Sequence, residues 1–264
     1  MTNLPHVGVG IIGGSGFYSF LEEPRLVDVP TPFGPPSAPI AVGSLAGREV
    51  AFLPRHGVDH RFPPHRIPYR ANLWALRHLG VAQVLTPCAV GSLQPDLHPG
   101  DLVVPDQLVD LTSGRIGTYY DGTDGVEHAA FADPYSPTGA RLAVEAARAS
   151  GLTVHPDGTL VVISGPRFSS RAESRWYSAQ GWSVIGMTGA PETALARELG
   201  MECTSIAMVT DYDAGVRPGE GVTQEAVLAV MAANLDHLRA VLVALVPRLP
   251  TITAPPLPTR LTTS

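Results

Sequence analysis

Short apolar runs alternate along this chain with segments of helical periodicity, and this alternation limits the fold more than any other feature of the sequence. The first run, Val7 to Ile12, ends in Gly13-Gly14 and predicts a buried strand that leads into a tight turn. Strands that alternate with helices form an α/β domain around a central sheet. Further runs predict strands at Ile40 to Val42, Val50 to Leu53, Val81 to Thr86, Leu102 to Val104, Thr159 to Ile163, Ser183 to Ile185 and Cys203 to Val209.

Four segments have the spacing of helices. Thr223 is a suitable N-cap for a long helix with an apolar stripe, and Gly200 ends a shorter helix that begins with Pro191. Glu192 lies near the N-terminus of that shorter helix, where the helix dipole favours an anion. The predicted helices are Tyr69 to Leu79, Thr138 to Ala149, Pro191 to Leu199 and Gln224 to Val246.

No internal repeat and no change of composition separates a second domain, so residues 1–247 are predicted to form one domain. The sequence after Pro247 contains four further prolines and little apolar periodicity. It predicts an extended or mobile tail over residues 248–264.

All 18 basic residues are arginine, since the sequence contains no lysine. A Schiff base to pyridoxal phosphate or to a carbonyl substrate, and the lysine of a nucleotide-binding P-loop, are therefore excluded. A bound phosphate must be held by arginine, histidine, hydroxyl groups or backbone amides. The formal net charge of -6 gives no general attraction to nucleic acid or to an anionic membrane, so we expect neither as a partner.

The two cysteines, Cys88 and Cys203, are too few for a disulfide framework and lack the spacing of metal ligands. The N-terminus MTNLPHVGVG does not have the basic and apolar regions of a signal peptide. No uninterrupted apolar run reaches the roughly 18 residues of a membrane span. We therefore expect a cytoplasmic protein.

A glycine-rich turn follows the first predicted strand. Gly8, Gly10 and Gly13 match the pattern GxGxxG, but Pro24 interrupts the segment where a dinucleotide fingerprint needs a helix. We favour a site in which backbone amides and the Ser15 hydroxyl hold a small anion, and a plain tight turn is the alternative.

Arg55 and His56 follow the apolar run AFLP, at the end of a predicted strand. Arg55 could bind a phosphate bidentately while His56 donates a further hydrogen bond. The alternative is that both are ordinary loop residues. His56, His60 and His65 lie close together, but Gly57 and two prolines make a helical metal site improbable, and no metal is expected.

Two further motifs carry polar or aromatic groups at strand ends. In SGPRFSSRAE, Phe168 could form the floor of a pocket for a flat ligand, or be a core aromatic, and Glu173 is expected to be buried. In TDYDAG, Asp211 and Asp213 follow an apolar strand and share a face if the strand pattern persists. Two carboxylates there suit acid–base work or hydrogen bonds to a heteroaromatic ring, or else cap a loop.

The segments IIGGSG, PRHG, GPRFSSRAES, MTGAPETALARELG and SIAMVTDYDAG together resemble the trimeric nucleoside phosphorylase family, and within it the members that act on 5'-methylthioadenosine. The resemblance extends from about Val7 to Pro247. It implies a mixed central sheet with flanking helices, a homotrimer, no metal or organic cofactor, and phosphate as the second substrate.

The resemblance also implies roles for individual residues. Cys88 stands beside the phosphate where adenine-specific members usually carry a hydroxyl residue, and Gln224 replaces a small apolar residue of the eukaryotic members. His128 resembles the residue that reaches the 5' pocket of a neighbouring subunit. The remaining implied positions are Ser15, Arg55, His56, Ala89 and Thr188 at phosphate, Phe168 and Met187 at base and ribose, Asp211 and Asp213 at the purine, and Val227 and Leu228 at the methylthio group.

The implied reaction is phosphorolysis of 5'-methylthioadenosine to adenine and 5-methylthioribose 1-phosphate, with Asp211 assisting departure of the purine. One alternative is a purine nucleoside phosphorylase acting on inosine, guanosine or methylthioinosine, although such relatives typically carry Asn in place of Asp211. Another is a binding or regulatory module without activity. The set Ser15, Arg55, His56, Thr188 and Asp211 argues against that module.

Overall fold

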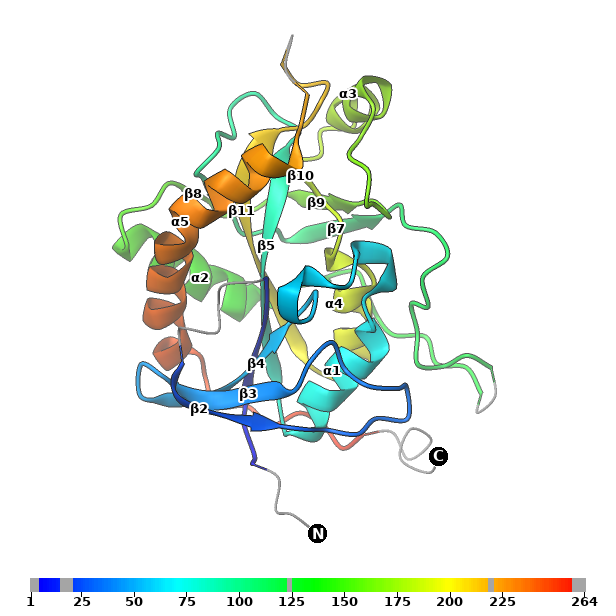
Figure 1. Ribbon diagram of the computed structural model, residues 1–264, viewed down its shortest axis with the longest axis vertical. Coiled ribbons are helices and arrows are strands. Elements are labelled where there is room, and N and C mark those ends of the chain that lie inside the picture. The colour runs from blue at the N-terminus through cyan, green and yellow to red at the C-terminus, as the bar shows by residue number, and fades with distance from the viewer. Residues whose placement is uncertain (1–4, 15–20, 123–124, 218–220, 258–264) are drawn as a thin grey trace.

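The computed structural model describes residues 5–14, 21–122, 125–217 and 221–257, and these form an eleven-stranded mixed sheet with helices on both faces (Figure 1). At its centre, β1 (Val9–Gly13) lies parallel to β4 (Arg48–Pro54) and to β5 (Gln83–Ser92). The other strands are β2 (Glu22–Val27), β3 (Ile40–Leu45), β6 (Leu102–Val103), β7 (Gln107–Asp110), β8 (Val154–His155), β9 (Thr159–Val162), β10 (Val184–Gly186) and β11 (Glu202–Tyr212).

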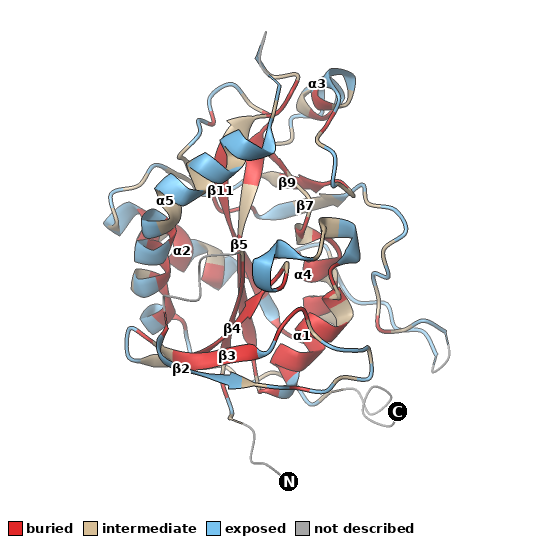
Figure 2. Cartoon of the chain, in the orientation of Figure 1, coloured by how far each residue is buried: buried red, intermediate tan, exposed pale blue. Residues whose placement is uncertain are grey.

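Strand β5 is the branch point of the sheet. On one edge its first three residues pair with β1 and its last two pair antiparallel with β10, while β11 pairs in parallel along the other edge. Most of β5 is buried, as Figure 2 shows along the middle of the molecule. Because β1, β4, β5 and β11 run in the same direction, their carboxyl ends meet on one side of the sheet.

The helices form two layers, one on each side of the sheet. Along β1 the alternate residues Val9 and Ile11 pack in one core cluster, and Ile12 packs in the other. The first cluster contains residues of α2 (Pro137–Ala149) and α5 (Gln224–Leu245), and the second contains residues of α1 (Tyr69–His78) and α4 (Gly189–Glu198). The predicted α/β class with a mixed sheet is confirmed.

All four predicted helices are present, within two residues of their expected bounds. Thr223 caps α5 by accepting from the backbone N–H of Ala226 at 3.2 Å, as predicted. In α4, Ala190 is non-helical, so the regular turns begin at Pro191.

A fifth helix, α3 (Arg171–Ala179), was not predicted. Ser170 and Glu173 form a capping box at its start. Glu173, which we expected to be buried, is partly exposed and forms an ion pair with Arg167 at 2.7 Å. The prediction that Glu173 is buried was wrong, because its carboxylate accepts a hydrogen bond from the Ser170 backbone N–H at the exposed N-terminus of α3.

Helix α5 contains both a packed and an open half. Leu238, Val241, Leu242 and Leu245 are buried in the core, whereas Leu228 is 53% exposed. The stretch Gln224–Arg248 could cross a membrane by length and composition alone, with a mean hydropathy of 1.6, but core helices of soluble proteins meet the same criterion. At the C-terminal end of α5, Arg48 of β4 donates to the Val246 carbonyl at 3.1 Å and to the Leu249 carbonyl at 2.5 Å, so the start of the tail lies against the sheet.

Candidate active site

A cavity of about 850 Å³ lies where the carboxyl ends of the parallel strands meet. Its walls are formed by residues of β5 and β11 and by residues that directly follow β1, β4 and β9. The connection from β10 to α4 and the first turns of α5 complete the lining. Most residues that the sequence singled out come together here, although they are spread along the chain. Those that line the cavity are Arg55, His56, Cys88, Ala89, Phe168, Met187, Thr188, Asp211, Asp213, Val227 and Leu228.

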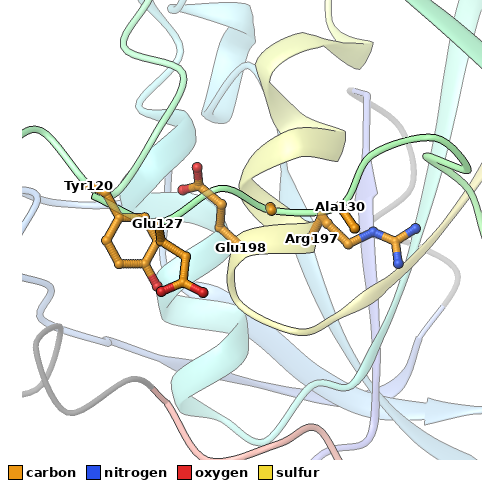
Figure 3. A pocket seen from close by; sticks show the side chains of 6 residues that line it. Tyr120, Glu127, Ala130, Arg197 and Glu198 are labelled. Carbon is orange, nitrogen blue, oxygen red and sulfur yellow. The ribbon is translucent and has the colours of Figure 1, made fainter. Parts of the chain in front are cut away.

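Two of the predicted positions are not among the lining residues. Ser15 lies outside the described residues, although Gly14 beside it lines the cavity. His128 is exposed, and its sequence neighbours Glu127 and Ala129 line a separate pocket of about 260 Å³. Figure 3 shows this second pocket, beside Arg197 and Glu198 of α4. His128 therefore does not reach the cavity of its own chain.

Arg55 is 2% exposed, and its guanidinium is held from several directions. Its Nε and Nη2 donate to the two carboxylate oxygens of Glu192, both at 2.9 Å. The same group donates from Nη1 to the Pro87 carbonyl at 3.0 Å and from Nη2 to the Ile12 carbonyl at 2.8 Å. The predicted bidentate grip on phosphate is therefore wrong, because Glu192 occupies the paired donors.

Burial by itself lowers the pKa of the Arg55 guanidinium, but the charge and hydrogen bonds of Glu192 outweigh that effect and raise it. Arg55 consequently stays charged in the site. Its charge is compensated, so the ion pair as a whole attracts an anion less strongly over distance than a lone arginine does.

His56 is neutral in this environment. Burial is the main cause that lowers the pKa of its imidazole to about 4; the hydrogen bond to the Phe62 carbonyl opposes the shift, and the adjacent Arg55 charge adds to it. Because a carbonyl can only accept, Nδ1 of His56 carries the proton that it donates to the Phe62 carbonyl at 2.9 Å. Nε2 is left as an acceptor, suited to a P–OH or sugar hydroxyl, and the predicted donation from His56 to phosphate would require the protonated ring.

The His56 ring stacks on the ring of His60, with centroids 4.0 Å apart. His60 also lines the cavity. The segment around them contains two short 3-10 turns, η2 (Val58–His60) and η3 (Pro64–Arg66), and no α-helix, as expected from its glycine and prolines. Within the described residues, no group of three or more His, Cys, Asp or Glu side chains could hold a metal ion.

Asp211 and Asp213 both line the cavity, at and just beyond the end of β11. The register between β5 and β11 shifts between Val209 and Asp211, so a bulge redirects the strand directly before the first carboxylate. Burial raises the pKa of Asp211 to about 6, the Thr210 hydroxyl at 2.8 Å opposes the rise, and Asp213 adds to it. A carboxyl group with this pKa can hold a proton near neutral pH and deliver it to a leaving group.

Ser169 is a cavity residue to which our sequence reasoning assigned no role. Its Oγ and the Oδ2 of Asp213 are both buried, and neither has a partner at ordinary hydrogen-bond distance and angle, although the Ser169 hydroxyl is near enough to lower the pKa of Asp213. Burial also raises the pKa of Asp213. Two such polar atoms on one cavity wall are suited to a ligand with its own donors and acceptors, such as a heteroaromatic ring.

Phe168 precedes Ser169 and is only half-buried, so the core alternative for this aromatic was wrong. The signal that could have identified Ser169 is its position directly after Phe168, at the start of a helix. The wall formed by α5 is mixed, because Val227, Leu228 and Met231 are apolar whereas Gln224 is polar.

The fold and this cavity define an α/β protein whose strand ends bring two acidic side chains and a buried arginine–glutamate pair to one cavity. The chain belongs to the phosphorylase superfamily, whose family model matches residues 8–247. The family resemblance expected from the sequence is thereby confirmed.

Two proteins of similar sequence and one solved structure illustrate this similarity. The chain is 58% identical to a purine nucleoside phosphorylase of Streptomyces coelicolor, over 95% of this chain and 92% of that protein. It is 59% identical to an S-methyl-5'-thioadenosine phosphorylase of Mycolicibacterium smegmatis, over 88% of this chain and 87% of that one. A methylthioadenosine phosphorylase from Schistosoma mansoni, solved in complex with adenine, superposes with a TM-score of 0.87 at 38% identity and covers 92% of this chain and 91% of its own.

Proposed function

We propose that this protein catalyses phosphorolysis of 5'-methylthioadenosine, giving adenine and 5-methylthioribose 1-phosphate. The observation that carries the proposal is the Asp211 carboxyl group, whose pKa is raised to about 6 by burial, in a cavity to which α5 contributes the apolar side chains of Val227, Leu228 and Met231 beside Gln224. The relatives named for this reaction, at 59% identity and below, support it.

The reaction breaks the bond between the anomeric carbon and a purine nitrogen. Positive charge develops on the sugar and negative charge on the base, so phosphate belongs on the sugar side and an acid on the base side. Arg55 and His56 lie at the end of β4, and Asp211 lies at the end of β11, on either side of β5 and β1. In the proposal, Asp211 shares a proton with the purine nitrogen at position seven and so assists its departure.

Phosphate is the proposed co-substrate, and no metal or organic cofactor is needed for this chemistry. Arg55, Thr188, the backbone at Ala89 and the segment containing Ser15 are the proposed contacts. His56 Nε2 would accept a hydrogen bond from a phosphate or sugar hydroxyl, since its Nδ1 proton is already engaged. The Cys88 thiol, as a weak donor, adds little at this position.

We further propose a homotrimer in the cytoplasm. The segment that contains His128 carries Ile116 and Val126, which are 60% and 65% exposed, and such apolar side chains suit a contact with a second copy. A neighbouring His128 would then complete the 5' side of each cavity. Two free cysteines, Cys88 and Cys203, are compatible with a reducing compartment.

A second candidate is a purine nucleoside phosphorylase activity on 6-oxopurine nucleosides such as inosine. Gln224 on the cavity wall favours a 5' hydroxyl over a thioether, and the relative from Streptomyces coelicolor is named for this activity. Against it stands Asp211: if its one proton is shared with the purine nitrogen at position seven, its other oxygen can only accept, which suits a 6-amino group and not a 6-oxo group.

The test is to incubate the purified protein with 5'-methylthioadenosine and to measure adenine and methylthioribose 1-phosphate. The proposal predicts equal amounts of both products and no release when phosphate is omitted. Adenine release at the same rate without phosphate would indicate a hydrolase. No release at all, together with rapid release of hypoxanthine from inosine, would select the second candidate.

A further inference from the structure

Glu192 is a buried carboxylate that the proposed reaction does not use directly. It is 1% exposed and lies in the first turn of α4. Thr188, which lines the cavity, is the N-cap of the same helix. One helix N-terminus therefore carries a cavity residue and also supplies the carboxylate that holds Arg55 from 137 positions away in the chain.

The hydrogen bonds of Arg55 leave little freedom to its guanidinium. An arginine has five N–H donors in a rigid plane. Nε donates to Glu192, Nη2 donates to Glu192 and to the Ile12 carbonyl, and Nη1 donates to the Pro87 carbonyl. One N–H of Nη1 is not engaged with another described residue, and Arg55 is a cavity residue.

We propose that Glu192 is a positioning residue, which fixes the guanidinium of Arg55 so that a single N–H of Nη1 serves the phosphate. This inference rests on the proposed function, because it concerns how the co-substrate is held. Arg55 then acts as one oriented donor, and Glu192 acts on phosphate only through Arg55.

The choice of a carboxylate at position 192 follows from the burial of Arg55. A buried guanidinium is unfavourable unless a charge compensates it, and the bidentate pair with Glu192 does so while setting the plane of the group. A glutamine at position 192 keeps one oxygen acceptor, but its NH₂ group replaces the other oxygen. Two donors, this NH₂ and an N–H of Arg55, would then face each other. The guanidinium must then turn away from its present orientation.

The test uses Glu192→Gln, with steady-state kinetics at varied phosphate and varied nucleoside. We expect KM for phosphate to rise roughly ten- to a hundredfold, as for loss of one charged hydrogen bond, while KM for the nucleoside changes by less than about threefold. A purely structural role would change both constants or neither. A fall in KM for phosphate would overturn the proposal, because Glu192 would then only screen the charge of Arg55.

The matched control is Glu198→Gln on the same helix. Glu198 accepts from the Thr118 hydroxyl and the Tyr119 backbone N–H, both at 2.7 Å, and lines the other pocket (Figure 3). Replacing Glu198 removes from α4 a carboxylate that accepts two hydrogen bonds, but it does not change any hydrogen bond of Arg55. KM for phosphate should therefore stay at the wild-type value.

Two double variants test whether Glu192 needs Arg55. Arg55→Met/Glu192→Gln and Arg55→Met/Glu192→Leu both lack the arginine, and the second removes the buried pair in favour of apolar groups, which proteins often tolerate. They should have the same KM for phosphate, and a difference between them would refute action through Arg55. If the wild-type protein shows no phosphate-dependent cleavage, the proposed function fails. If the wild type does cleave with phosphate but the variants do not show the expected KM values for phosphate, only the role of Glu192 fails.

Discussion

Gly91 and Asp211 are paired on neighbouring strands, β5 and β11, and the Asp211 carboxyl group lies against the position that a Cβ atom of residue 91 would occupy. A Cβ atom at position 91 would lie 2.9 Å from Oδ1 of Asp211 and 3.2 Å from Cγ2 of Ile185. The carboxyl group of Asp211 thus occupies the space that a side chain on β5 would take. Strand β5, at which the sheet branches, therefore leaves space for the Asp211 carboxyl group because it has a glycine at position 91.

Replacing Gly91 by alanine should displace this carboxyl group. Because misplacement of a reacting group by about 1 Å can cost on the order of a hundredfold in rate, we expect kcat/KM to fall by about that factor. Gly8→Ala is the control, since no atom lies within 4 Å of a Cβ built there. Steady-state kinetics on both variants check this, and an unchanged kcat/KM for Gly91→Ala would mean that the position of Asp211 is not critical.

The activity should depend on pH through Asp211. Its pKa of about 6 lies above the ordinary aspartate value of 3.8, so the protonated acid is lost as pH rises through about 6. We expect kcat/KM to fall across that range in wild type, and Asp211→Asn to lose this limb while keeping the titration of phosphate itself. Profiles measured from pH 5 to 8 in both proteins decide the matter, and identical profiles would exclude Asp211 as the acid.

Stability should show the opposite trend for His56. Its pKa is lowered to about 4, so between about pH 4 and the ordinary value of 6.5 the unfolded chain binds the extra proton. His56 should therefore contribute a rise in the free energy of unfolding with pH over that window, on the order of 2 to 3 kcal/mol, against the opposite contribution from the raised pKa of Asp211. Urea unfolding at several pH values should show that His56→Gln removes this rise, whereas replacing the exposed His65 in the same segment leaves it. An equal slope in all three proteins would contradict the neutral, buried imidazole.

Assembly should be required for activity if His128 serves a neighbouring cavity. His128→Ala should raise KM for the nucleoside while leaving KM for phosphate near its wild-type value, since the residue is placed on the 5' side. Light scattering at assay concentration should give three chains per particle. A fully active monomer would contradict both the assembly and the role of His128.

The sequence predicted the parts of the fold whose side chains are buried in a regular pattern. β1, β4, β5 and β11 are apolar runs because they are covered by helices on both faces. β2 was missed because its residues Glu22 to Leu26 are exposed and include Pro24, so no apolar pattern identifies it. α3 was missed because its capping box lies inside a segment that we had interpreted as part of a binding motif.

The cavity was largely predictable because polar residues directly after apolar strands meet at one edge of the sheet. The spacing of residues in the sequence does not predict which hydrogen-bond or ion-pair partner each polar side chain has. Glu192 was recognised only as an acid near a helix N-terminus, and its pairing with Arg55 depends on tertiary contact between α4 and the end of β4. The proton on Nδ1 of His56 likewise follows from one backbone carbonyl, that of Phe62.

The most direct test of the central claim is a competition between 5'-methylthioadenosine and inosine in one reaction with saturating phosphate. The ratio of adenine to hypoxanthine released, corrected for the two concentrations, equals the ratio of the two kcat/KM values. We predict that adenine is released in large excess by wild type, and that Asp211→Asn lowers the ratio by on the order of 10² or more, because the amide can donate to a 6-oxo group. Excess hypoxanthine from wild type, or a ratio that Asp211→Asn leaves unchanged, would contradict the assignment of Asp211 to the adenine base.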